Sequence, residues 1–94
     1  MSEQQKKTPE SKARASALGS LAMREHSCAE LRTKLLNKNH DEAIVDRLIV
    51  ELLEHDYVSD QRFAESYWRS RSDKGYGVDR ISRELPQKGV SAAV

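Results

Sequence analysis

Basic side chains at helical spacing are the groups in this sequence that could bind a ligand. Arg62 and Arg69 lie seven residues apart, which places them along one outer edge of a single helix. Arg80 and Arg83 share one face of a later helix. Each Lys or Arg that contacts a phosphate releases counterions, so cations on successive helices can add their attraction along an extended target. The pattern fits either a surface that binds a long polyanionic partner or the solvated basic edge of helices that pack in a core.

Groups for covalent or metal chemistry are few and poorly placed. Cys28 falls in a first helical turn, where the helix dipole can lower a thiol pKa, but no His or Asp stands where it would activate the thiol. The three histidines are widely separated and lack the i, i+4 spacing of a zinc helix. We therefore expect a structural role for Cys28, no metal or other cofactor, and no enzymatic activity.

Composition indicates a helical protein with a thin core. Of the 94 residues, 37% are hydrophobic, 33% are charged, and only four are Gly and two Pro. The net charge of +1 hides an alternation: residues 1–40 carry eight basic and four acidic side chains (+4), residues 41–60 carry one and seven (−6), and residues 61–94 carry seven and four (+3). A single Cys allows no intrachain disulfide, and no segment has the pattern of a membrane span. We expect a cytoplasmic protein without membrane contact.

Three helices are predicted in the first half of the chain. Residues 1–10 are polar and should form a disordered tail, and a helix is expected over residues 11–25. Ser27 and Glu30 have the spacing of a capping box, which should begin a second helix. The third helix, at about residues 42–55 with Asp41 as its N-cap, has the most apolar stripe in the chain and an acidic face that we expect to be solvated.

Two helices are predicted in the second half. The first should begin after Ser59, a good N-cap, and end at Lys74-Gly75. Its inward stripe holds Phe63, Ala64, Tyr67, Trp68 and Arg71. We expect the aromatic side chains of this stripe to pack in the core, whereas Tyr76, between two glycines in a loop, should be exposed. The second helix follows Gly77 and should end or kink near Leu85, because Pro86 lacks an N–H and disfavours a helical residue before it.

An internal repeat emerges when the chain is laid on itself at an offset of 50 residues. The matched positions include Leu31 with Ile81, Leu35 with Leu85, Lys38 with Lys88, and Asn39 with Gly89. The predicted fold is therefore all-α, built from tandem three-helix modules at residues 11–58 and 59–94. The second module lacks the counterpart of helix 42–55, so we expect the chain to be truncated. In this alignment Arg71 is equivalent to Leu21, so Arg71 takes a core-facing position. Three roles stay open for its side chain: snorkelling to solvent, pairing with an acid, and contact with a partner.

Three ordered motifs resemble those of the RecX regulatory proteins, over about residues 18–90. They read Arg24-Glu25-His26-Ser27-x-x-Glu30-Leu31-x-x-Lys34-Leu35, Asp60-x-Arg62-Phe63-Ala64-x-x-Tyr67-x-Arg69-Ser70-Arg71, and Lys74-Gly75-Tyr76-Gly77-x-x-Arg80-Ile81-x-x-Glu84-Leu85-x-x-Lys88-Gly89-Val90. The resemblance implies a non-enzymatic cytoplasmic regulator, an inhibitor of the RecA recombinase. Family members are built of tandem three-helix repeats, bind in the groove of the RecA–DNA filament, and restrain its growth, ATP hydrolysis and strand exchange in recombination, DNA repair and the SOS response.

The residues and the resemblance together give a set of expected contacts. The expected partners are the RecA filament and single- and double-stranded DNA, bound without sequence specificity. The candidate contact residues are Arg32, Lys34, Arg62, Arg69, Arg71, Lys74, Tyr76, Arg80, Arg83 and Lys88. Two alternatives stay open: a helix-turn-helix-like DNA-binding domain, and a protein-interaction scaffold without nucleic acid.

Overall fold

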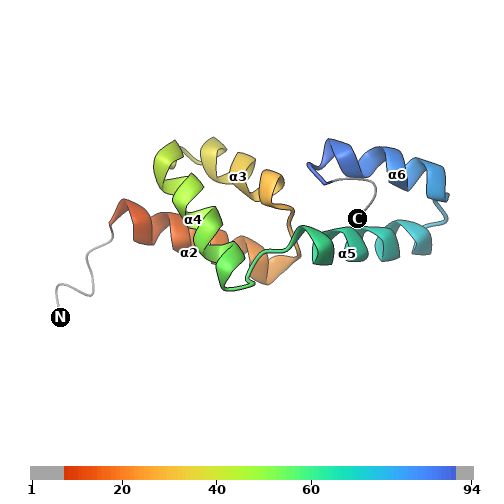
Figure 1. The fold of residues 1–94 in the computed structure, drawn as a ribbon, viewed down its shortest axis with the longest axis horizontal. Coiled ribbons are helices and arrows are strands. Elements are labelled where there is room, and N and C mark those ends of the chain that lie inside the picture. The colour runs from red at the N-terminus through yellow and green to blue at the C-terminus, as the bar shows by residue number, and fades with distance from the viewer. Residues whose placement is uncertain (1–7, 91–94) are drawn as a thin grey trace.

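The computed structural model describes residues 8–90, and within this range the chain is all-α, without a strand. The helices form an elongated array with extents of 53 × 23 × 22 Å (Figure 1). This confirms the predicted all-α fold. The helices are α2 (Pro9–Met23), α3 (Cys28–Asn37), α4 (Glu42–Glu54), α5 (Asp60–Asp73) and α6 (Val78–Gln87).

The helix starts follow local capping chemistry. Ser27 and Glu30 form both bonds of the capping box at α3, while Asp41 caps α4 and Ser59 caps α5, as predicted. The predicted tail is wrong at its last residues, because α2 begins at Pro9. Thr8 is the N-cap there, and its hydroxyl accepts the N–H of Ser11 at 3.0 Å. Residues 1–7 and 91–94 lie outside the described residues.

The prediction that the last helix ends or kinks near Leu85 is wrong by two residues, since α6 continues through Pro86 to Gln87. Leu85 is fully buried, and its carbonyl accepts the N–H of Val90 at 3.1 Å while that of Pro86 accepts the N–H of Gly89 at 3.0 Å. These are the two bonds of a Schellman C-cap, and together with burial of Leu85 they hold the last turn against the proline's preference.

The 50-residue repeat is present in the helices. Helix α3 covers residues 28–37 and α6 covers residues 78–87. Both end in the same left-handed C-cap: Asn39 has φ 71° and Gly89 has φ 85°. The N–H of His40 bonds the carbonyl of Leu35 at 3.3 Å, as that of Val90 bonds Leu85. The chain is thus a tandem repeat in which residues 8–90 contain three helices of the first module and two of the second.

Two separate hydrophobic clusters support the two copies. The larger holds buried side chains from α2, α3 and α4, namely Ala13, Ala17, Leu31, Leu35, Val45, Leu48, Leu52 and Val58. The smaller lies between α5 and α6 and holds Phe63, Ala64, Ile81, Leu85 and Val90. Tyr67 and Trp68 pack against this second cluster, half-buried, so the prediction that they are core side chains is confirmed. None of the helices within residues 8–90 has the length and apolar character needed to cross a bilayer.

Candidate binding surface

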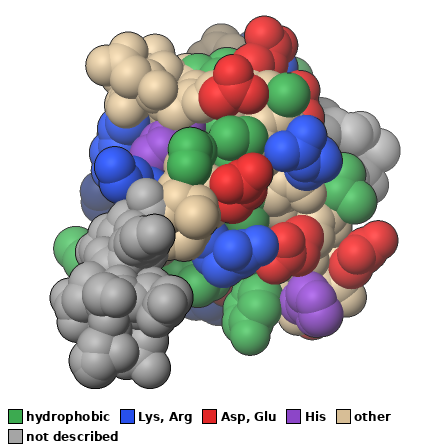
Figure 2. All heavy atoms as spheres, turned by 90° about the vertical axis from the view of Figure 1, so that its left-hand side faces the viewer, with side chains coloured by type: hydrophobic (Ala, Val, Ile, Leu, Met, Phe, Trp, Pro, Cys, Tyr) green, Lys and Arg blue, Asp and Glu red, His purple; other side chains and the backbone are tan. Residues whose placement is uncertain are grey.

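Arg32, a predicted contact residue, is held within the first module. Its Nε donates to Asp46 at 2.7 Å and its Nη2 donates to Glu42 at 2.6 Å, so it links α3 to α4. The hydrogen bond from Arg32 lowers the pKa of the Asp46 carboxyl. Figure 2 shows acidic and basic side chains interspersed at this end of the molecule. The acidic face of α4 is therefore exposed but partly neutralised from within the chain.

Arg62 is also engaged, and it bridges the two modules. Its Nε donates to Glu25, at the end of the first module's opening segment, at 3.1 Å. Its Nη1 lies 3.1 Å from the Asp56 carboxylate, and its Nη2 donates to the Asp56 carbonyl at 2.9 Å. Because these contacts use the guanidinium on both sides, Arg62 fixes the loop between α4 and α5, and its contact with a partner stays a prediction.

A cluster of cations and aromatic rings joins α5 to α6. The Arg80 guanidinium lies 4.1 Å from the Tyr76 ring centroid, and that of Arg71 lies 5.3 Å from the same ring. Glu84 lies 3.7 Å from Arg71 and 3.2 Å from Arg80, and it accepts the Tyr67 hydroxyl at 2.6 Å. These bonds, that of Tyr67 first, lower the pKa of the Glu84 carboxyl. Arg71 thus pairs with an acid, one of the three roles left open by the sequence.

The prediction that Tyr76 is an exposed aromatic side chain in a loop is wrong. The side chain is half-buried and packs against the second hydrophobic cluster, between the guanidiniums of Arg71 and Arg80. The positive φ of Gly75, 89°, turns the chain back over α5 and brings the ring into this place. Tyr76 therefore helps to hold α6 against α5.

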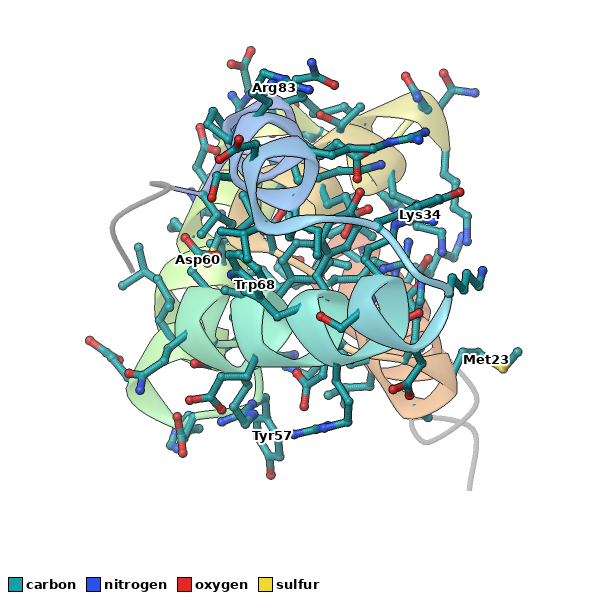
Figure 3. The ribbon with its side chains drawn as sticks, turned by 90° about the vertical axis from the view of Figure 1, so that its right-hand side faces the viewer. Met23, Lys34, Tyr57, Asp60, Trp68 and Arg83 are labelled. Carbon is teal, nitrogen blue, oxygen red and sulfur yellow. The ribbon has the colours of Figure 1, made fainter. Side chains whose placement is uncertain are left out.

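The other predicted cations differ from Arg32, Arg62, Arg71 and Arg80 in their ion pairing. Arg69, Lys74 and Arg83 are exposed, Lys88 is half-buried, and none of these four has an ion pair within the part of the chain that the structure describes. Figure 3 shows Arg83 at the outer edge of α6. These side chains are available to a ligand, and whether they contact one stays a prediction.

Lys34, the last of the predicted set, is half-buried beside His26. Its Nζ lies 3.3 Å from His26 Nε2, while His26 Nδ1 lies 3.0 Å from the carbonyl oxygen of Arg24. Since an ammonium only donates, Nε2 accepts and Nδ1–H donates, which requires the neutral imidazole. His26 is almost completely buried, and this burial lowers its pKa.

A cleft of about 260 Å³ opens at the junction of the modules. Its walls come from the segment after α2, from α3, from α5 and from the end of α6, and its lining residues are Arg24, Glu25, Glu30, Phe63, Ser66, Tyr67, Ser70, Arg71, Lys74 and Lys88. Sequence reasoning did not connect Arg24, Ser66 or Ser70 with the predicted cations. The 50-residue repeat could have identified Arg24, because Arg24 and Lys74 are equivalent positions.

The junction beside this cleft is held by side chain to backbone bonds. Ser27 Oγ donates to the Lys88 carbonyl at 2.6 Å, and the Cys28 N–H donates to Asp60 Oδ1 at 2.8 Å. Asp60 thereby satisfies one of the N–H groups left open at the start of α3. Ser27 is fully buried, so the contact excludes water. The two modules are therefore locked together at the start of α3.

Cys28 behaves as a structural residue at this junction. Burial, and then the charge of Asp60, raise the pKa of its thiol to about 11. These effects outweigh the helix dipole, which would lower that pKa. The thiol is protonated near neutral pH. This supports the structural role predicted for it.

Comparison with known proteins gives two matches that follow the repeat. The model for "RecX, first three-helix domain" matches residues 13–52, and that for "RecX, second three-helix domain" matches residues 59–94. The chain belongs to the RecX family. The second match begins at Ser59, the N-cap residue of α5, and the resemblance read from the three sequence motifs is confirmed.

Curated relatives of this RecX-family chain carry the name "Regulatory protein RecX". The protein of Haemophilus influenzae (strain PittGG) is 45% identical over 75 residues, covering 79% of this chain and 49% of the relative. That of Vibrio parahaemolyticus serotype O3:K6 is 37% identical over 91 residues, covering 97% and 59%, and that of Halorhodospira halophila is 42% identical over 81 residues, covering 86% and 50%. The chain spans about half the length of these relatives.

The neutral state of His26 leads to a pH prediction. Because its pKa is lower in the folded state than in the unfolded chain, the unfolded state binds more protons, so stability falls as pH decreases through the histidine range. We expect the urea midpoint of the wild type to fall more than that of His26→Gln between about pH 7.5 and about pH 5.5, which brackets the ordinary value of about 6.5. The other histidines are common to both proteins and cancel in this comparison. An equal fall in both would show that His26 does not carry the effect.

Proposed function

We propose that this chain regulates the RecA recombinase by binding along the RecA–DNA filament and restraining its growth, ATP hydrolysis and strand exchange. It would act without catalysing a reaction of its own, in the bacterial cytoplasm, in recombination, DNA repair and the SOS response. Membership of the RecX family supports this proposal, and so does the word "regulatory" in the name of the relatives.

The tandem arrangement of the two modules is the observation that carries the proposal. Two modules joined by part-buried hydrogen bonds at Ser27 and Asp60 form an array 53 Å long. A repeated unit whose modules are held together at their joint can follow a repeating target, because each module then meets an equivalent site. Cations without ion pairs within residues 8–90 then add modest attractions that do not depend on base sequence.

The helix-turn-helix alternative gains no support from α6. Arg80 is exposed but already engaged by Glu84 and Tyr76, which leaves Arg83 as the arginine of this helix without an ion pair among residues 8–90. Reading a base pair directly needs side chains that project freely into a groove. We therefore propose DNA contacts to the backbone, in single and double strands, without sequence specificity.

Charge reversal of Arg69 and Arg83 tests the proposal. Both side chains are exposed and unpaired within the described residues, so Arg69→Glu with Arg83→Glu should leave the helices intact. We expect the double variant to bind RecA–single-stranded DNA filaments roughly tenfold more weakly, about 1.4 kcal/mol, because two attractions are replaced by repulsions. The measurement is the RecA ATPase rate on single-stranded DNA as a function of added protein, at constant salt, with helicity followed by circular dichroism.

A matched control reverses two cations that were not predicted as contacts. Lys12→Glu with Arg47→Glu changes the net charge equally, on the outer part of the first module. It should inhibit the RecA ATPase almost as the wild type does. No effect of the wild type on RecA would refute the proposed function, and equal weakening by both double variants would refute the proposed contact face.

A further inference from the structure

The cleft at the module junction combines several cations with little opposing charge. Of its two lining carboxylates, Glu25 is 3.1 Å from Arg62 Nε, and Glu30 accepts Arg24 Nη1 and Nη2 at 3.1 and 3.2 Å. Hydrogen bonds from Arg24 lower the pKa of Glu30 despite its partial burial. Each lining carboxylate is therefore already neutralised by an arginine. Lys74 and Lys88 have no ion pair within residues 8–90, so the cleft has an uncompensated positive charge.

We propose that this cleft binds a phosphate of a nucleic-acid backbone, with Lys74 and Lys88 supplying the charge. The inference rests on the proposed function, since it names the component of the RecA–DNA filament that the module junction would meet. It assigns these two lysines to nucleic acid and not to RecA.

The two lysines are the cations of the cleft that remain to bind a phosphate. Arginine can clamp a carboxylate or a phosphate with two parallel N–H bonds, but the arginines around the cleft are already engaged. Arg24 donates two bonds to Glu30, Arg62 donates one bond to Glu25, and Arg71 lies over the Tyr67 ring. The free cations are lysines, which bind as compact point charges and need no matching planar group. Such charges suit a phosphodiester, whose two outer oxygens share one negative charge.

The backbone fixes both lysines at the mouth of the cleft. Lys74 is the C-cap residue of α5 and Lys88 is the C-cap residue of α6, each followed by a glycine with positive φ. Helix C-termini favour cations. The Lys88 carbonyl is further tied to the Ser27 hydroxyl at 2.6 Å, across the junction. The ammonium groups can thus be presented to a ligand with little reordering of the chain.

Hydroxyl groups and free volume complete the site. Ser66 and Ser70 line the cleft one helical turn apart on α5. Their hydroxyls can donate to phosphate oxygens that the ammonium groups leave unbonded. The volume of about 260 Å³ greatly exceeds the roughly 30 Å³ that one water occupies in the liquid, so the cleft has room for a phosphate group.

The experiment measures DNA binding without RecA. A 5′-fluorescein-labelled oligothymidylate is titrated with the wild type and with Lys74→Gln plus Lys88→Gln, by fluorescence anisotropy at several salt concentrations. We expect the double variant to bind about tenfold more weakly at low salt, with a slope of log K against log[salt] shallower by about 0.7, the value for one phosphate contact to a single strand. Lys12→Gln plus Arg47→Gln is the matched control, and it should change both quantities much less.

Several results would overturn the inference. Absence of oligothymidylate binding by the wild type would do so, as would equal losses in the variant and its control. So would a cleft variant that keeps DNA binding but loses its effect on the RecA ATPase, because the cleft would then meet an acidic protein segment. If the salt slope falls as expected while even the wild type leaves the RecA ATPase unchanged, the phosphate site stands and the proposed function fails.

Discussion

Gly89→Ala is expected to lower the free energy of unfolding by about 3 kcal/mol, for two separate reasons. Gly89 has φ 85°, where an alanine costs about 1–2 kcal/mol. A Cβ at this position would also overlap the Cβ of Ala29 on α3. Forcing a methyl group into a packed contact costs typically about 1–3 kcal/mol, and here the strain would separate the end of α6 from α3.

Two further variants separate these reasons. Gly75 has φ 89° but nothing within 4 Å of an added Cβ, so Gly75→Ala should lose only the conformational part, about 1–2 kcal/mol. Adding Ala29→Gly to Gly89→Ala should restore part of the stability, because it removes the overlap. Urea unfolding followed by the fluorescence of Trp68, the sole tryptophan of the chain, reports on the second module. Equal losses in Gly75→Ala and Gly89→Ala would show that the modules do not pack closely at Ala29.

Ser27→Ala is expected to lower the free energy of unfolding by about 2–3 kcal/mol. The Ser27 hydroxyl accepts the N–H of Glu30 at 3.0 Å and donates to the Lys88 carbonyl at 2.6 Å. Loss of a helix N-cap costs about 1 kcal/mol. The Lys88 carbonyl would also lose its donor at a buried contact, which lowers the free energy of unfolding by a further amount of about 1–3 kcal/mol. The lower end of this range applies if water enters and bonds the carbonyl.

Ser59→Ala is the matched control for this prediction. Ser59 caps α5 through the Arg62 N–H at 3.1 Å, and no bond of its hydroxyl across the junction is found among the described residues. Its loss should be about 1 kcal/mol. Urea midpoints followed by circular dichroism give both values. If the two alanine variants lose the same stability, the bond to Lys88 contributes nothing and the junction is not locked there.

Both predictions concern the junction because the proposed function depends on it in two ways. The lock at Ser27 keeps the modules in one line, and it also places Lys88 at the cleft. A variant that loosens the junction should therefore weaken DNA binding as well as stability. Charge changes at Lys74 should alter DNA binding and leave the bond between Ser27 and Lys88 intact.

The sequence predicted the helices well because their signals are local. Ser27, Asp41 and Ser59 cap the residues directly after them, and each does so in the structure. The repeat was also readable, since equivalent turns need equivalent residues: Asn39 and Gly89 both tolerate positive φ. Pro86 misled the prediction. The C-cap formed by Gly89 and Val90 is local, but the burial of Leu85 depends on how α6 packs against the rest of the chain.

The sequence by itself determined the all-α fold, the two copies of the repeat, the core stripes and the family. Only the tertiary structure decided which of the predicted cations are free. Arg62 meets Glu25 across 37 positions of sequence, and Arg32 meets Asp46 across 14. Helical spacing places a side chain on a face of its own helix, but its charge partner depends on how that helix packs against the others. The cleft at the module junction follows from the same packing, which brings Lys74 and Lys88 to one opening.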